Sequence, residues 1–121
     1  MSGFTSGASP IDLERIHDAT GGDEEFLAEL VEIFLEDAEL RLEEIRGAVE
    51  AADPTELRKT AHKLKGSSAN MGANGLMGLA KTLEDMGHQG QVNGADEHLK
   101  GLYSEYARVK AELERVVAQG G

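Results

Sequence analysis

Cysteine is absent from the sequence, and aromatic residues are scarce, since three phenylalanines and two tyrosines are the only ones among 121 residues. The absence of cysteine excludes a disulfide framework and thiol chemistry, and it is compatible with a reducing compartment. Hydrophobic residues still make up 40% of the chain. Most of them are Leu, Ala, Val, Ile and Met, and a core built from these residues favours the packing of helix on helix over a β-sandwich.

Basic residues are few compared with acidic ones. Lys and Arg number 12 and Asp and Glu number 23, which gives a net charge of −11. A chain this acidic is expected to be repelled by nucleic acid and by anionic membrane surfaces. No apolar run reaches the length that crosses a bilayer, and the first residues lack the basic and apolar parts of a secretion signal. These features predict a cytoplasmic protein of one domain. A length that fits one domain with its own core favours a free-standing monomer, and a piece of a longer protein stays the alternative.

Apolar residues recur at spacings of three and four in four long stretches, as they do along one face of an α-helix. No stretch alternates as a half-buried β-strand does. Because the connections between the stretches are short, the pattern predicts an all-α fold, an antiparallel up-down-up-down four-helix bundle. The four apolar stripes are Leu27, Leu30, Val31, Phe34, Ala38, Leu42, Ile45, Val49 and Ala52; Leu57, Ala61, Leu64, Ser68 and Met71; Leu76, Leu79, Ala80, Leu83 and Met86; and Ala95, Leu99, Leu102, Tyr106, Val109, Leu113 and Val116.

A short extra N-terminal helix is expected in front of the bundle. Ser9 as N-cap and Pro10 at the first helical position would begin it, Leu13 and Ile16 would be its apolar contacts, and Gly21-Gly22 would end it. Residues 1–8 are small and polar and are expected to be flexible. The predicted division is a flexible N-terminus at 1–8, a bundle domain at 9–118 and a flexible C-terminus at 119–121.

The starts of three of the long helices carry capping signals. Asp23 can cap the first of them, and Asn93 can cap the last. Asp53-Pro54-Thr55-Glu56 combines a cap, a proline at the first helical position and an acid two residues later, which is typical of a capping box. The helix that begins at Asp53 is expected to end at Gly72.

This central helix contains a segment that helix stability does not explain. His62 lies about 100° around the helix from Ala61 and therefore faces away from the bundle centre. It shares the outer face with Lys65 and Gly66, although a glycine inside a helix costs about 1 kcal/mol relative to alanine. The glycine is explained if a bulky partner must approach the imidazole, which is a nucleophile when neutral. Since Lys65 favours an anion, these residues predict a phosphorylated histidine.

The run from Ala61 to Ala73, Ala-His-Lys-Leu-Lys-Gly-Ser-Ser-Ala-Asn-Met-Gly-Ala, closely resembles the signature of histidine-containing phosphotransfer (HPt) domains. Phe34–Ala38 is similar to the matching segment of the family's preceding helix, and Leu79–Gly87 is similar to its following helix. The resemblance extends over residues 9–118.

The resemblance implies a phosphoryl carrier. By position, His62 would accept a phosphoryl group from the aspartyl phosphate of one receiver domain and pass it to the aspartate of another. Lys65 would steady the phosphoryl group, and Gly66 would admit the receiver, which belongs to a response regulator or to a hybrid histidine kinase. The receiver would supply Mg²⁺, so no cofactor or metal of its own is expected. The sequence has no nucleotide-binding pattern, which predicts a carrier protein and not an enzyme with its own ATP site.

Further residues are candidates for contact with the receiver. Five lie on the outer face of the central helix and are basic or small, and two are apolar residues off the stripe of the preceding helix. They are Arg58, Lys59, Lys63, Ser67, Ala69, Ile33 and Leu40.

Two other kinds of function stay open. The first is a non-catalytic adaptor or inhibitor that binds a receiver or a kinase without phosphoryl transfer, against which the intact set of His62, Lys65 and Gly66 argues. The second is a metal or cofactor bundle. Glu14-x-x-His17 matches half of a di-metal carboxylate site, but a second Glu-x-x-His is missing, so no metal is predicted. His88 is interpreted as a helix end.

Overall fold

The computed structural model describes residues 9–119, in which five α-helices and no β-strand occur. The prediction of an all-α fold is therefore confirmed. The segments 1–8 and 120–121, which include most of the two predicted flexible ends, lie outside the described residues. The helices are α1 (Leu13–Thr20), α2 (Glu24–Glu50), α3 (Pro54–Asn70), α4 (Asn74–His88) and α5 (Ala95–Ala118).

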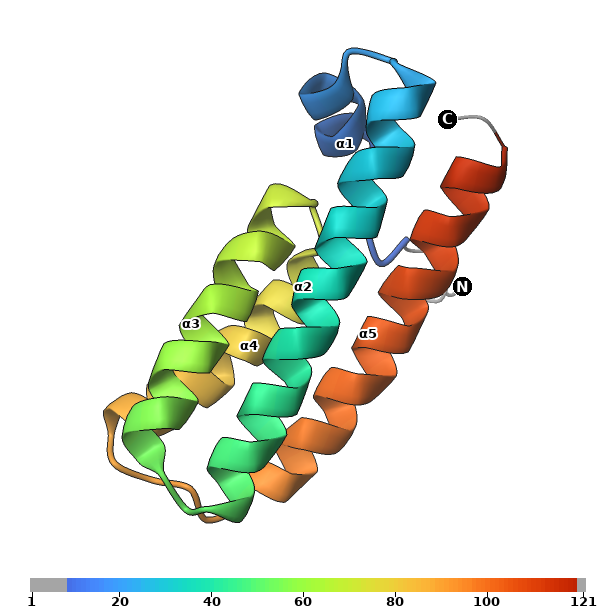
Figure 1. The fold of residues 1–121 in the computed structure, drawn as a ribbon. Helices are drawn as coiled ribbons and strands as arrows, with labels where there is room; N and C mark the ends of the chain where they lie inside the picture. Colours follow the sequence, from blue (N-terminus) through green and yellow to red (C-terminus); the bar gives the residue numbers. More distant parts are fainter. Residues whose placement is uncertain (1–8, 120–121) are drawn as a thin grey trace.

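The four long helices contact one another in a closed ring (Figure 1). α2 packs against α3, α3 against α4, α4 against α5, and α5 back against α2. The short helix α1 packs against α2 and lies at one end of the ring (Figure 1). Within residues 9–119, no helix is long and apolar enough to span a bilayer.

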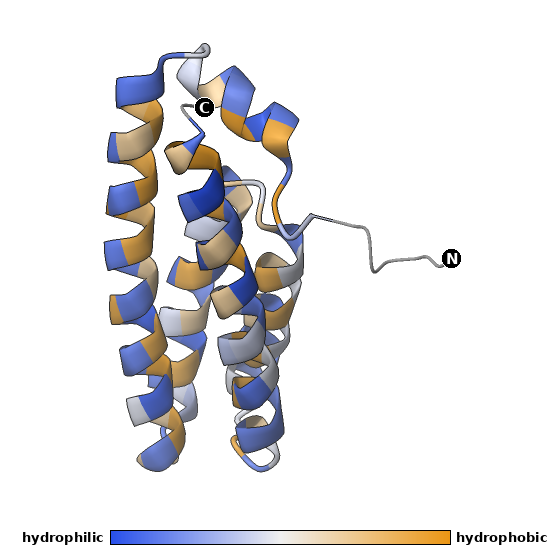
Figure 2. Cartoon of the chain, turned by 90° about the vertical axis from the view of Figure 1, so that its right-hand side faces the viewer, coloured by the Kyte–Doolittle hydropathy of each residue, from blue (hydrophilic) through white to orange (hydrophobic). Residues whose placement is uncertain are grey.

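The core lies inside this ring and is formed by one apolar stripe from each long helix. Figure 2 shows the apolar and polar faces of α2, the long helix that is joined to α1 at the top of the view. The apolar residues of α2 face the other helices, and its polar residues face outward. Every predicted stripe residue of α5 is buried, from Ala95 to Val116. The stripe that runs from Leu57 to Met71 along α3 and its C-cap is buried as well. Burying one large aliphatic side chain contributes about 1.5–3 kcal/mol to folding, so these stripes supply most of the driving force.

The predicted stripe of α2 needs one correction. Ala52 is exposed, because α2 ends at Glu50 and Ala52 takes a positive φ of 52° in the turn that follows. Ala48 lies in the core in its place, 3% exposed. Leu30 and Val49 pack against the core only in part.

Two aspartates cap their helices as predicted. The carboxylate of Asp23 accepts a hydrogen bond from the Phe26 N–H at 3.0 Å, and that of Asp53 accepts one from the Glu56 N–H at 3.1 Å. The reciprocal half of the capping box does not form, because the Asp53 N–H donates to the carbonyl of Ala48 at 2.9 Å. The chain therefore turns sharply from α2 into α3.

The predicted start of α1 was wrong. The helix begins at Leu13, and its N-cap is Asp12, whose carboxylate accepts hydrogen bonds from the two N–H groups that follow Leu13. The segment just before the helix is fixed in place by a hydrogen bond of 2.8 Å from the Asp12 N–H to the carbonyl of Gly72. This places Ile11 in the core, while Leu13, a predicted core contact, is 44% exposed.

The predicted cap of α5 was also wrong. Gly94 occupies the N-cap position with a φ of 87°, and no side chain caps the helix there. Asn93 lies one residue earlier and is exposed. A glycine takes this left-handed conformation at little cost, whereas most other residues do not.

Gly87 allows α3 and α4 to approach closely, and its replacement by alanine should be strongly destabilising. A Cβ at this position would lie 2.6 Å from the carbonyl oxygen of Pro54 and 2.7 Å from the backbone nitrogen of Arg58. Backbone atoms cannot yield without separating the two helices, so we expect Gly87→Ala to lower the free energy of unfolding by about 2–3 kcal/mol. Urea unfolding followed by circular dichroism measures this change.

Gly47→Ala is the matched control for this substitution. Gly47 lies in α2, and a Cβ there would meet nothing within 4 Å. Alanine should raise the stability by up to about 1 kcal/mol, because it is the better helix former. A Gly87→Ala protein as stable as wild type would contradict the close packing of α3 on α4.

Candidate functional site

His62 projects from the middle of α3 toward solvent. Its side chain is 64% exposed, whereas Ala61 and Leu64 beside it are completely buried. The same helix therefore places one face in the core and presents the imidazole on the other. This is the orientation that the apolar stripe predicted.

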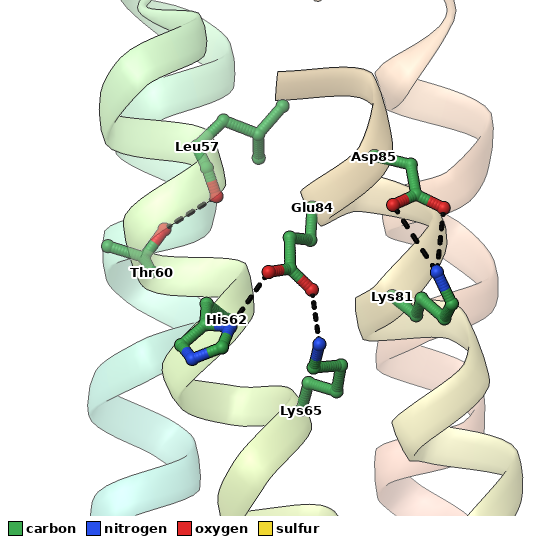
Figure 3. A network of polar contacts seen from close by, with 7 residues as sticks. All are labelled: Leu57, Thr60, His62, Lys65, Lys81, Glu84 and Asp85. Atoms are coloured by element: carbon green, nitrogen blue, oxygen red, sulfur yellow. Dashed lines mark hydrogen bonds and ion pairs between the residues drawn. The ribbon is translucent and has the colours of Figure 1, made fainter. Parts of the chain in front are cut away.

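Glu84 of α4 connects the imidazole to Lys65 (Figure 3). One carboxylate oxygen, Oε2, lies 2.7 Å from Nδ1 of His62, and the other, Oε1, lies 2.8 Å from Nζ of Lys65. The Glu84 side chain is only 17% exposed. A sheltered carboxylate on one helix thus holds the two residues of the neighbouring helix that were predicted to act together.

The protonation of this cluster follows from its charges. Burial raises the pKa of the Glu84 carboxyl, but the hydrogen bonds and charges of Lys65 and His62 outweigh burial and leave its pKa below the ordinary value. Glu84 is therefore ionised at neutral pH, and an ionised carboxylate can only accept hydrogen bonds.

This ionised state fixes the tautomer of the neutral imidazole. Nδ1 of His62 must carry the proton that it donates to Glu84, so the lone pair is on Nε2. In Figure 3 the second ring nitrogen points away from Glu84. The lone pair of Nε2 is therefore on the side of the ring that faces away from Glu84.

A hollow of about 440 Å³ lies along the seam between α3 and α4 next to His62. Most of the side chains that line it are basic, and Lys81 and Asp85 on its rim form an ion pair at 3.1 Å. The seven lining residues are Arg58, His62, Lys65, Lys81, Glu84, Asp85 and His88. A local excess of basic groups on a protein of net charge −11 favours an anion here.

Gly66 lies one turn after His62 on the same outer face. A Cβ at this position would meet nothing within 4 Å, so an alanine would touch neither the imidazole nor any other neighbour. Intramolecular packing therefore gives no reason for the glycine, and the space above it is open.

The other predicted contact residues are spread more widely. Arg58 lines the hollow together with His62 and Lys65. Lys59 and Lys63 are exposed on α3, and Ala69 is half-buried. Ser67 is half-buried too, and its hydroxyl donates to the carbonyl of Leu64 at 3.2 Å and not to the imidazole. On α2, Ile33 and Leu40 are 63% and 52% exposed.

Sequence reasoning missed the residues that α4 contributes. Glu84, Lys81 and Asp85 were not singled out, and His88 was interpreted only as a helix end, which it also is. No spacing rule connects positions 62 and 84, because the contact depends on how α3 and α4 are aligned. The available signal was weak: a glutamate directly after the core residue Leu83. Within residues 9–119 there is also no group of three or more side chains that could hold a metal ion.

Comparison with known proteins agrees with this site. A family model described as the Hpt domain matches residues 29–119. The crystal structure of histidine-containing phosphotransfer protein B (HptB) from Pseudomonas aeruginosa PAO1 is similar, with a TM-score of 0.87 and 30% sequence identity over 93% of this chain and 98% of that chain. A search of curated proteins found no match. The resemblance seen in the sequence is thereby confirmed, and the chain belongs to the family of Hpt domain proteins, the histidine phosphotransfer proteins of phosphorelays.

Proposed function

We propose that the protein carries a phosphoryl group on Nε2 of His62 between two receiver domains. The observation that carries this proposal is the contact of 2.7 Å between Nδ1 of His62 and the ionised carboxylate of Glu84. It leaves the exposed Nε2 with a lone pair, next to Lys65 and beneath the open space at Gly66.

The transfer balances without a further reactant. Nε2 attacks the phosphorus of the receiver's aspartyl phosphate, a P–N bond forms as the P–O bond breaks, and the aspartate leaves as a carboxylate. The proton on Nδ1 stays on the ring, so the phosphorylated imidazole is a cation next to Glu84. Transfer to the second receiver is the reverse of these steps. The Mg²⁺ that neutralises the phosphoryl oxygens would be held by the receiver, and ATP would be consumed only upstream by a kinase.

The receiver would dock over the outer face of α3. Lys59, Lys63 and Ala69 lie on this helix, and the exposed Ile33 and Leu40 offer apolar contacts on α2. Receivers of response regulators and of hybrid histidine kinases are the expected partners. Lys65 would contact the phosphoryl group, since its ammonium group is already held beside the imidazole.

The proposal includes the finer architecture. The circular order of helix contacts and the short connections support an antiparallel up-down-up-down four-helix bundle over residues 9–118. The cytoplasmic location and the monomeric state expected from the sequence remain predictions.

The alternative is a non-catalytic adaptor or inhibitor that binds a receiver or a kinase. The exposed apolar residues of α2 would serve such a role equally well. An adaptor has no use for a histidine held in one tautomer, and the alternative is therefore the weaker one.

Incubation with a phosphorylated receiver tests the proposed function. We expect a phosphoryl group that is labile in acid and stable in base, and ¹H–³¹P NMR should assign it to Nε2 of His62. The physical reason is that Glu84 occupies Nδ1. Phosphorylation of another residue, or of Nδ1, would contradict the mechanism, and receiver binding without any labelling would favour the adaptor.

A further inference from the structure

The contacts between α3 and α4 fix which residues face each other across the hollow. Gly87 lies against the backbone of Pro54 and Arg58, and Glu84 reaches His62 and Lys65. Residue numbers therefore rise along α3 as they fall along α4. Residues four apart are neighbours on a helix surface, so one turn away from the contact between His62 and Glu84 the next pair is Arg58 and His88.

This pair differs from the other basic residues of the hollow in having no partner. Lys65 is held by Glu84 at 2.8 Å, and Lys81 is held by Asp85 at 3.1 Å. Neither Arg58 nor His88 makes a side-chain hydrogen bond or an ion pair with any residue in the range 9–119. Arg58 is half-buried and His88 is exposed.

An unpaired basic pair at this place is suited to an anion. A guanidinium group presents a planar set of donors that fits phosphate oxygens, and a protonated imidazole adds a donor with positive charge. Side chains lean toward the N-terminus of their helix, so His62 leans toward the level of Arg58, and His88 leans toward the level of Glu84. Both imidazoles are thereby directed into the same stretch of the hollow.

We infer that Arg58 and His88 form a subsite that holds the oxygens of the phosphoryl group while it is attached to His62. This inference rests on the proposed function of His62. It assigns Arg58 a second role beside that of a receiver contact, and it assigns His88 a role that the sequence did not suggest. The subsite stabilises the phosphorylated carrier itself, before and after the receiver is bound.

His88 can donate a hydrogen bond to a phosphoryl oxygen through a ring N–H. The charged groups around it come from both helices of the seam. They are Arg58, His62 and Lys65 on α3 and Lys81, Glu84 and Asp85 on α4. Since Glu84 and Asp85 are each engaged by a lysine, His88 has the phosphoryl group as its free anionic neighbour.

The decisive measurement is the equilibrium constant for phosphoryl exchange between the free carrier and one free receiver. This constant does not depend on how well the two proteins dock, so it separates a subsite from a docking contact. We expect Arg58→Gln to shift the constant toward the receiver by about threefold to tenfold, the range of a partly exposed charge-assisted hydrogen bond. His88→Ala should shift the constant in the same direction, because it removes the second donor of the subsite.

Matched controls exist on other helices. Lys100→Gln removes an exposed charge from α5, and His17→Gln removes an exposed histidine from α1. Neither residue lines the hollow, so neither variant should shift the constant. If Arg58→Gln does not fold, Arg58→Lys and His88→Ala serve as the test. Arg58→Lys should give a smaller shift, because lysine keeps the charge but loses the planar donor set.

Each outcome has one reading. An unchanged exchange constant together with a slower rate would overturn the subsite and leave Arg58 as a docking contact. An exchange constant that His88→Ala leaves unchanged would overturn the role of His88 in the subsite. Failure of the proposed function would look different, because wild-type His62 would then not be labelled at all.

Discussion

Replacement of His62 by glutamine is expected to abolish acceptance of the phosphoryl group, with labelling by a phosphorylated receiver reduced by at least about 1,000-fold. The glutamine amide can still donate a hydrogen bond to Glu84, so the environment of that carboxylate is largely retained. What is lost is the nucleophilic Nε2. Because the His62 side chain is 64% exposed, the free energy of unfolding should change by less than about 0.5 kcal/mol. Single-turnover transfer followed by radiolabel, together with urea unfolding, measures both effects.

The control for this variant is His98→Gln on α5. His98 is half-buried outside the hollow, and full labelling should be retained. If the His62→Gln protein were labelled at the wild-type rate, a different residue would have to be the acceptor. If the variant kept full biological activity and tight receiver binding without labelling, the adaptor function would replace the one proposed above.

Replacement of Gly66 by glutamate is expected to slow transfer by about 100-fold or more without harming the fold. A substituent at this position meets nothing within the chain, so it extends into the space that the receiver must occupy. The added carboxylate also repels the phosphoryl group, and steric and electrostatic obstruction together easily cost about 3 kcal/mol in the transition state. The helix itself should gain up to about 1 kcal/mol, because glutamate is a better helix former than glycine.

Two controls separate the causes of this effect. Gly66→Ala should be as stable as Gly66→Glu and should transfer much faster, since the Cβ alone has open space around it. Ser104→Glu adds the same charge to an exposed position of α5 and should leave transfer unchanged. An unaltered transfer rate in Gly66→Glu would remove the argument about approach space, and loss of folding would show that the position is structural.

Periodicity predicted the helices well, because the face of a helix that is buried can be read from the spacing of apolar residues along the sequence. The stripe from Ala95 to Val116 required only a spacing of three and four, and every residue in it is buried. His62 could be found for the same reason, since it lies about 100° around the helix from the core position Ala61. Asp23 and Asp53 were likewise predictable, because a cap acts only on the residues that follow it.

The remaining features depend on contacts between segments that are distant in sequence. Asp12 replaced Ser9 as the cap of α1 because its N–H is held by Gly72, far along the chain. Glu84 reaches His62 because Gly87 brings two backbones together. No local pattern gives the alignment of two helices. For this reason the α3 half of the site was predicted and the α4 half was not.

The contact between Glu84 and Nδ1 of His62 is in place while the carrier is empty. Because this contact engages Nδ1 and the proposed phosphoryl group is carried on Nε2, the same contact serves both the acceptance and the release of the group. Mass action then governs the net flow. The carrier becomes phosphorylated when phosphorylated receivers are abundant, and it passes the group on when unphosphorylated receivers are abundant. The phosphorylated fraction of the carrier therefore reflects the ratio of phosphorylated to unphosphorylated receivers.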